Sequence, residues 1–337
     1  MPFHRLLLLA LLVCGLRAGD PAPDFGPSVV PAKGDPAVNL ATLRGKVAIL
    51  VFFQSWCPVC NEWAPGFVQQ MEEAYGSDPR VVLVAVKTDG DAAGGKDFLK
   101  GKGANLDRWL VLSDTDAAYV TRLLGKDELW QYAVIRPDGS LAESGKAGSY
   151  FPNGGKKDFV LPDKNFGSAL GAQVRPFLAG TYPEALTRAV RLAEANLPVE
   201  AITAAAASGD AQAKAFRDEV LATLGERIEA QAAILADSAQ TADARMIAYE
   251  DLARQAQALK GSEPGKVAAK AVSEAGKDKA LKGELAALKA WTAMQAKLAQ
   301  VPADQAKAAI ADAYPRFIKA HEGTAMAARA QAALGGG

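Results

Sequence analysis

The stretch VAILVFFQSWCPVCNEWAP (residues 47–65) places two cysteines directly after a run of apolar residues. The run over residues 46–53 is continuous and of strand length, which is typical of a strand buried on both faces of a sheet. Residues 61–76 carry a large apolar side chain at every fourth position from Trp63 to Tyr75, which indicates a helix. The stretch therefore predicts a strand and then a helix, with Cys57 at the corner between them.

The spacing of Cys57 and Cys60 favours dithiol chemistry. The N–H groups at a helix N-terminus stabilise a thiolate, and Cys60 lies about one turn further along, within reach to close a Cys57–Cys60 disulfide. We expect Cys57 to be the solvent-accessible nucleophile and Cys60 the buried thiol that resolves the mixed disulfide. A disulfide that closes so short a loop adds little stability, which favours a chemical role over a structural one.

A metal site is not expected at these cysteines. Structural zinc needs four ligands from Cys, His or carboxylate, the sequence has no second pair of this kind, and His321 is far away. No metal and no other cofactor are therefore predicted.

Residues 1–18 have the pattern of a secretory signal peptide. Arg5 precedes an apolar run over residues 6–16 that is short for a membrane span, and Ala18 fits a cleavage position. Cleavage would remove Cys14 and leave an exported chain, periplasmic or extracellular, with no membrane attachment. An uncleaved anchor is the alternative.

The rest of the first half alternates strands and helices. Strands are predicted over residues 80–90 and 109–116, and helices over 91–103 and 117–125. A β-hairpin over 132–145 turns at Pro137-Asp138-Gly139. Lys plus Arg equals Asp plus Glu, so no basic field favours a nucleic acid partner.

This region resembles the thioredoxin-fold superfamily, specifically the exported TlpA/redoxin type of thiol–disulfide oxidoreductase. The resemblance covers about residues 20–180 and is carried by APDF (22–25), by VNLATLRGKVAILVFFQSWCPVC (38–60) and by Pro65. It implies an α/β fold with a mixed central sheet flanked by helices. It also implies protein dithiol or disulfide substrates, an upstream electron donor, and substrate contacts at Trp56, Pro58 and Val59.

One position departs from the family pattern. The family has a cis-proline facing the cysteines, and the spacing from Gly125 and Gly139 puts Trp130 at that position. A cis bond before Trp costs about 3–4 kcal/mol, so we expect a trans bond and a remodelled loop. Trp130 is predicted either to contact substrate or to cover the dithiol as an apolar lid. A second, milder departure is Val51, where thioredoxins often carry a buried acid.

Residues 181–337 are rich in Ala, Glu, Lys, Gln and Leu, which predicts an all-α domain. A helical bundle and a helical-hairpin repeat are both open, because no fixed period is evident. The Gly/Pro break at AGTYP (179–183) predicts a boundary near residue 180 between two separable domains. The helical domain is a candidate surface for a protein partner.

The leading hypothesis is an enzyme that reduces or exchanges protein disulfides and serves cell redox homeostasis. Because Pro58 and Val59 bring no positive charge beside the thiolate, we expect the redox potential of the pair to be reducing or neutral and not that of a strong oxidant. The alternative is a non-enzymatic binding module with an inert disulfide and a helical interaction domain. A peroxidase is disfavoured, because Gln54 stands where the peroxidase pattern has threonine.

Overall fold

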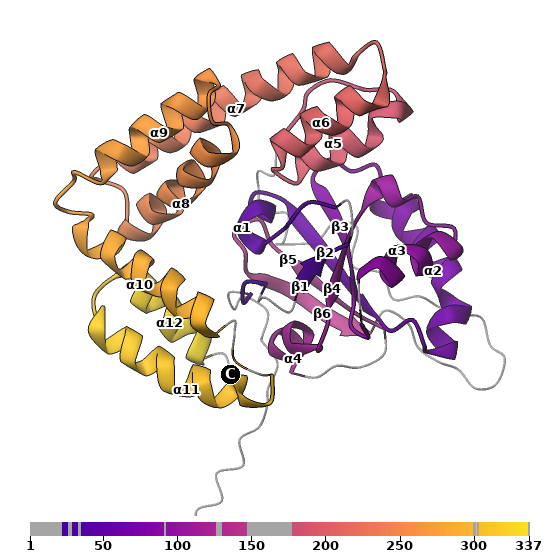
Figure 1. Ribbon diagram of the computed structural model, residues 1–337, viewed down its shortest axis with the longest axis horizontal. Coiled ribbons are helices and arrows are strands. Elements are labelled where there is room, and N and C mark those ends of the chain that lie inside the picture. The colour runs from indigo at the N-terminus through magenta and orange to yellow at the C-terminus, as the bar shows by residue number, and fades with distance from the viewer. Residues whose placement is uncertain are drawn as a thin grey trace, which may run out of the picture.

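The computed structural model describes residues 22–25, 29–32, 35–90, 92–125, 130–146, 177–298, 301 and 303–335. The expected signal peptide over residues 1–18 lies outside these residues. Within them, the first half folds as a mixed sheet with helices on both faces, and the second half is helical (Figure 1). The predicted fold class is therefore confirmed.

The sheet has the strand order β1-β4-β3-β2-β5-β6. The three central strands β2, β3 and β4 are parallel, and β1, β5 and β6 pair antiparallel with their neighbours. The strands predicted over residues 46–53, 80–90 and 109–116 and the predicted hairpin are all present. The strand bounds are β1 Val29–Pro31, β2 Val47–Phe53, β3 Val81–Lys87, β4 Trp109–Asp114, β5 Gln131–Ile135 and β6 Leu141–Lys146.

Alternate residues of the strands point to opposite faces, so each face carries its own core. One face packs against α2 (Pro58–Tyr75) and α3 (Ala92–Gly101), and its core contains both cysteines. The other face packs against α1 (Leu40–Leu43), α4 (Ala118–Leu124) and α5 (Thr187–Glu194). A 3-10 turn at Leu106–Arg108 leads into β4.

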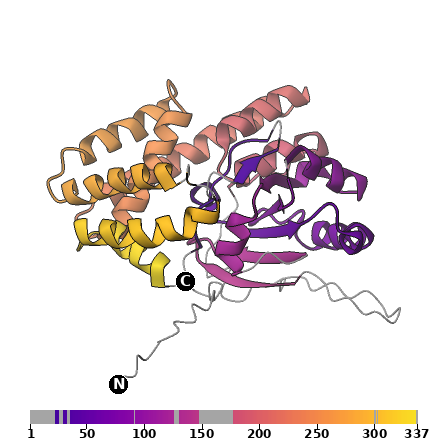
Figure 2. The same ribbon diagram turned by 60° about the horizontal axis from the view of Figure 1, so that its bottom comes forward.

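The helical region forms an arc of successive helices beside the sheet (Figure 1). Helices α8 to α12 lie toward one end of the longest axis of the molecule and α2 lies toward the other, as Figure 2 also shows. A 3-10 turn at Glu184–Leu186 precedes α5. The bounds are α6 Pro198–Ser208, α7 Ala213–Ala236, α8 Ala242–Ala258, α9 Glu263–Ala275, α10 Lys282–Leu298, α11 Ala303–Ala320 and α12 Ala325–Gly335.

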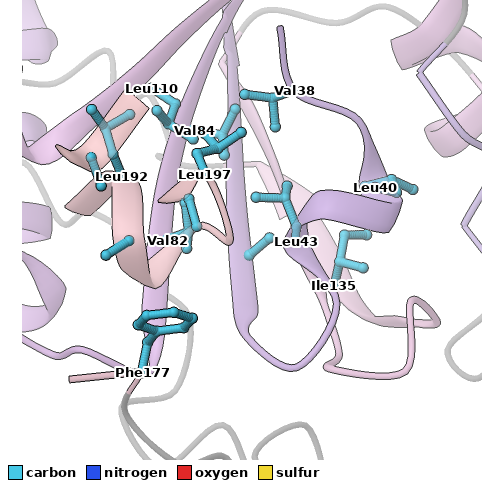
Figure 3. Packing of buried hydrophobic residues seen from close by; sticks show 14 of the residues in the cluster. Val38, Leu40, Leu43, Val82, Val84, Leu110, Ile135, Phe177, Leu192 and Leu197 are labelled. Atoms are coloured by element: carbon cyan, nitrogen blue, oxygen red, sulfur yellow. The ribbon is translucent and has the colours of Figure 1, made fainter. Parts of the chain in front are cut away.

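The two regions share one hydrophobic core. Leu192 of α5 and Leu197 belong to the same buried cluster as Val82, Val84 and Leu110 of the sheet (Figure 3). The cluster continues through α6 to α9. The domain boundary near residue 180 stays a prediction, but a sheet whose core is completed by α5 is not an independent unit in packing terms.

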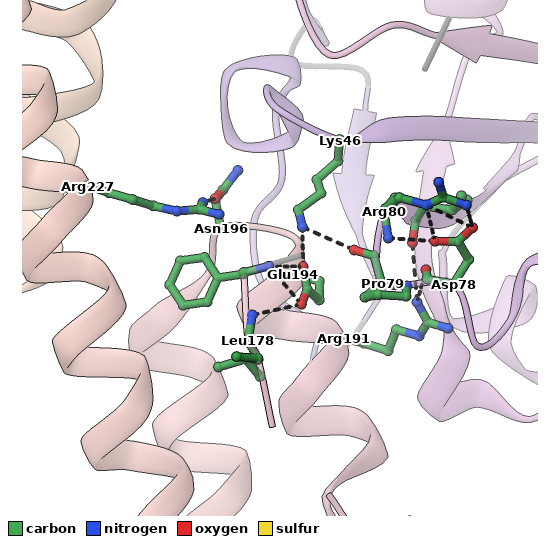
Figure 4. A network of polar contacts seen from close by, with 12 residues as sticks. Lys46, Asp78, Pro79, Arg80, Leu178, Arg191, Glu194, Asn196 and Arg227 are labelled. Carbon is green, nitrogen blue, oxygen red and sulfur yellow. Dashed lines mark hydrogen bonds and ion pairs between the residues drawn. The ribbon is translucent and has the colours of Figure 1, made fainter. Parts of the chain in front are cut away.

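A buried polar network reinforces this junction (Figure 4). Lys46 stands just before β2 and forms an ion pair with Glu194 at the end of α5, and both side chains are 1% exposed. Lys46 Nζ also donates to Pro79 O at 3.0 Å. Glu194 accepts from the backbone N–H groups of Phe177 and Leu178. Burial lowers the pKa of Lys46, while Glu194 opposes that shift.

Arg191 and Asn196 of the helical region donate hydrogen bonds to backbone carbonyls of the sheet region. Arg191 Nη1 donates to Asp78 O and Val81 O, both at 3.2 Å. Asn196 Nδ2 donates to Thr42 O and Arg44 O, both at 2.8 Å. These bonds fix α5 and the loop after it against the N-terminal ends of β2 and β3.

Candidate active site

Cys57 lies at the predicted corner between β2 and α2. It is the N-cap residue of α2, with φ −70° and ψ 118°, and Pro58 begins the helix. The helix thus starts three residues earlier than predicted, since proline is well suited to the first helical position. The backbone N–H of Cys60 donates to Cys57 Sγ at 3.2 Å. Cys57 sulfur therefore receives a helix N-terminal N–H, as a thiolate at this position requires.

Cys60 lies in the first turn of α2, and its environment favours the neutral thiol. Burial raises the pKa of the Cys60 thiol, and the adjacent Cys57 sulfur raises it further by hydrogen bonding and charge. Both cysteines are free thiols in the structure. One sulfur is thus positioned to accept hydrogen bonds while the other keeps its proton, which is the asymmetry that a nucleophile and a resolving thiol need.

The expectation that Cys57 is solvent-accessible is wrong for this structure. Cys57 and Cys60 are each 1% exposed and belong to the buried cluster on the α2 face of the sheet. Trp56, immediately before Cys57, is instead 66% exposed. The corner does expose the chain, but it exposes the residue before the nucleophile, because the Cys57 side chain turns back under the first turn of α2.

Asp89 fixes the turn that precedes Cys57. Its Oδ2 accepts from Ser55 N and Ser55 Oγ, both at 2.8 Å, and from Trp56 N at 3.3 Å. Asp89 follows β3, whose carboxyl end lies beside that of β2 because the two strands are parallel. Sequence reasoning missed this residue because the strand predicted over residues 80–90 included it, whereas β3 ends at Lys87. The polar residues at the end of the predicted strand were the available signal.

Asn61 holds the same turn from the helix side. Its Nδ2 donates to Ser55 O at 2.8 Å and to Cys57 O at 3.0 Å. Lys87, the last residue of β3, places its ammonium 3.2 Å from Asp89 Oδ1 and is only 5% exposed. The sequence offered no cation close to the cysteines along the chain, and the fold brings this one near by pairing Lys87 with Phe53.

Trp130 lies just before β5, beside the end of β2 that leads to the dithiol corner. It is 5% exposed and belongs to the same cluster as Cys57 and Cys60. Its ring stands edge-on to Phe67 at 5.3 Å between centroids, and 6.5 Å from Phe53. Its φ of +59° is left-handed, which for a bulky residue costs about 1–3 kcal/mol. The expected trans bond joins it to Leu129, outside the described residues.

Other features of the site add little chemistry. Pro58 is exposed at the start of α2, and Val59 follows it within the helix. Among the residues the structure describes, no group of three His, Cys, Asp or Glu side chains could hold a metal ion. Over that same part of the chain, none of the helices has the length and apolar character that a membrane span demands.

The chain resembles known redox proteins in this region. Residues 17–154 match the Redoxin family model. The chain is 30% identical over 102 residues to the soluble secreted antigen MPT53 of Mycobacterium tuberculosis, which covers 30% of this chain and 53% of that protein. It is 36% identical over 75 residues to the thiol-disulfide oxidoreductase ResA of Oceanobacillus iheyensis, or 22% of this chain and 38% of that protein. The chain thus spans about half the length, or less, of these relatives.

Solved structures of similar proteins include a thiol:disulfide interchange protein DsbE from Chlorobium tepidum. It is 27% identical and covers 41% of this chain and 89% of that chain, with a TM-score of 0.32. A secreted disulfide oxidoreductase of Mycobacterium tuberculosis is 25% identical and covers 38% and 84%, with a TM-score of 0.28. Residues 17–154 of this chain are thus similar to redoxins and to thiol–disulfide oxidoreductases, and a helical region follows the mixed sheet that they form.

Proposed function

We propose that this protein is an exported thiol–disulfide oxidoreductase that reduces or exchanges disulfides of protein substrates. The observation that carries the proposal is the asymmetry of the pair. Cys57 is the N-cap of α2 and receives the Cys60 N–H at 3.2 Å, while the pKa of the Cys60 thiol is raised by burial. In this reading Cys57 attacks the substrate disulfide and Cys60 releases the product.

Export is part of the proposal. Support comes from the predicted signal peptide and from relatives described as secreted, namely the MPT53 antigen and the Mycobacterium tuberculosis oxidoreductase. An exported compartment provides the disulfide substrates that such a dithiol needs. An upstream electron donor would return the pair to the dithiol state, and the helical region is a candidate surface for a protein partner.

The test is disulfide exchange with and without each cysteine. The reduced chain should reduce insulin or a peptide disulfide in the presence of dithiothreitol. Cys57→Ser should abolish this activity. Cys60→Ser should instead trap a mixed disulfide on Cys57, because the resolving thiol is gone. If Cys57→Ser reduces substrates as fast as the unmodified chain, the dithiol is not the reactive centre.

A second function deserves the same experiment, because one observation favours it. Both sulfurs are 1% exposed, and the buried side chain of Trp130 shares their cluster. A scaffold of this kind could serve only to bind a partner, with a dithiol that never reacts. Absence of exchange with any disulfide, in a folded and fully reduced sample, would support this binding module and overturn the enzyme.

A further inference from the structure

The register of the sheet places Trp130 beside the dithiol corner. Gln131 of β5 pairs with Phe52 of β2, so Trp130 stands next to Phe53, the last residue of β2. From Phe53 the chain runs through the Asp89-bound turn to Cys57. The Trp130 ring also contacts Phe67 of α2, the helix that carries both cysteines. The indole is therefore wedged between the two elements that hold the dithiol.

Disulfide exchange needs an open approach to the attacking sulfur. Cys57 and Cys60 are each 1% exposed, and Trp130 is 5% exposed in the same cluster. A substrate disulfide therefore cannot reach Cys57 Sγ while the cluster keeps this packing. Reaction requires a displacement, and Trp130 stands just before the first residue of β5 rather than inside a helix or a strand.

Two properties of Trp130 indicate that its ring is held by apolar packing and not by a hydrogen bond to the described residues. Its backbone is left-handed, a conformation that bulky side chains rarely adopt. Its indole Nε1–H is buried and finds no hydrogen-bond acceptor among the residues that the structure describes. A buried donor without an acceptor is unfavourable. Moving the indole outward would break no hydrogen bond to a residue that the structure describes, and it would let the N–H meet an acceptor.

We propose that Trp130 sets the substrate class of this dithiol, an inference that rests on the proposed function. A polypeptide disulfide flanked by apolar residues opens the site: it displaces the indole, replaces its apolar contacts and offers a backbone carbonyl to the free N–H. Small charged disulfides such as glutathione disulfide do not open it, because their carboxylates would enter an apolar cluster without partners.

The reaction at the opened site is a balanced two-electron exchange. The Cys57 thiolate attacks one substrate sulfur, and the substrate S–S bond breaks to give a mixed disulfide and a substrate thiolate. Cys60 then loses its proton and attacks Cys57 Sγ, which releases the second substrate thiolate and closes the Cys57–Cys60 disulfide. The substrate gains two electrons and two protons, and the protein dithiol loses them.

The experiment compares three oxidants of the reduced full chain by stopped-flow: a peptide disulfide flanked by leucines, the same peptide flanked by glutamates, and glutathione disulfide. The leucine-flanked peptide should react at least about tenfold faster than the other two. Trp130→Gly accepts the left-handed backbone without strain and removes the indole. It should bring the three rates close together and raise iodoacetamide labelling of Cys57 by about tenfold.

Three further variants make the test decisive. Trp130→Asn also tolerates a left-handed backbone and gives a second open site if the glycine variant is unstable. In Trp130→Phe, iodoacetamide labelling of Cys57 should stay as slow as in the unmodified chain. Exchange with the leucine-flanked peptide should become slower, because the N–H donor is gone. Ala117→Gly removes a left-handed non-glycine residue outside the site, with φ +55°, and should change nothing.

Two outcomes would overturn the inference. One is an unmodified chain that reacts with glutathione disulfide as fast as with the leucine-flanked peptide, which needs no variant to measure. The other is a folded Trp130→Gly chain with unchanged labelling and unchanged rate ratios. Both leave exchange itself intact, whereas failure of the proposed function would appear as labelled Cys57 that exchanges with none of the three disulfides.

Discussion

Buried polar groups lie at both ends of strand β2, and the two ends differ in how fully these groups are hydrogen-bonded. At its start, Lys46 and Glu194 are each 1% exposed and are bonded to one another and to backbone groups of Pro79, Phe177 and Leu178. Beyond its end, the cysteines are equally buried, but the nearby Trp130 N–H has no acceptor among the described residues. Buried polar groups with full partners hold a fold together, and those without partners mark places that can rearrange. The junction therefore acts as the fixed end and the dithiol corner as the reactive end.

Removal of the helical region should have the largest effect. A chain that ends at Gly180 loses α5, whose Leu192 completes the sheet core, and loses Glu194 as the partner of buried Lys46. We expect it to lack a cooperative thermal transition, whereas a chain that ends at Asp237 and keeps α5 to α7 should retain one. Calorimetry of both chains is the measurement. A cooperative transition near that of the full chain in the Gly180 product would instead establish the sequence-predicted separable domain.

Breaking the buried ion pair is the next largest change. Glu194→Ala leaves the buried Lys46 charge without its ion-pair partner and the Phe177 and Leu178 N–H groups without their acceptor. This should lower the free energy of unfolding by about 3–5 kcal/mol. The control is Glu263→Ala, which removes an exposed pair with Lys266 and should cost about 0–1 kcal/mol. Urea denaturation gives both values. Equal costs would mean that the junction is not held by its buried charges.

At the reactive end, Asp89→Ala should slow disulfide exchange as well as lower stability. It removes the acceptor of three donors on Ser55 and Trp56 and leaves buried Lys87 without its ion pair. We expect a stability cost of about 1–3 kcal/mol and about tenfold slower disulfide exchange, since the turn before Cys57 is no longer fixed. Ser55→Ala removes only the hydroxyl donor and should affect exchange much less. Normal exchange in Asp89→Ala would assign this carboxylate a structural role alone.

The smallest predicted effect is a pH dependence that comes from Cys60. Its pKa is raised in the folded chain above the ordinary thiol value of 9.0, so the unfolded chain releases this proton first as pH rises. The reduced protein should therefore lose stability through this group as pH rises through 9, with the contribution of the group unchanged at lower pH. Comparison with reduced Cys60→Ala isolates the effect from other titrations. A stability difference between the two chains that stays constant from pH 7 to pH 10 would contradict the raised pKa.

The sequence predicted the strand, the corner and the dithiol because these depend on neighbours along the chain. An unbroken apolar run fixes β2, and the apolar spacing from Phe67 to Tyr75 fixes α2. The burial of Cys57 did not follow from these neighbours. An apolar cover was offered only as one of two roles of Trp130, because only the folded sheet brings Trp130 and Phe67 into one cluster with the cysteines. The same holds for Asp89, whose position depends on the parallel pairing of β3 with β2.

The junction was missed for a similar reason. Glu194 reads in the sequence as an ordinary residue of a charged helix, and the change in composition near residue 180 suggested separate domains. The side chain is buried because α5 packs on the sheet, where Lys46 also lies. Composition identifies a helix, but only the pairing of its apolar face identifies what the helix covers.

The central claim is that Cys57 and Cys60 form a reversible two-electron dithiol. Its most direct test is to equilibrate the full chain in glutathione buffers of graded potential and to measure intact mass after acid quenching. We predict a single two-electron transition in which the chain loses two hydrogens, with a midpoint in the reducing or neutral range, and no transition in Cys57→Ser. A chain that stays a dithiol across the series, or that gains only glutathione adducts, would contradict the claim.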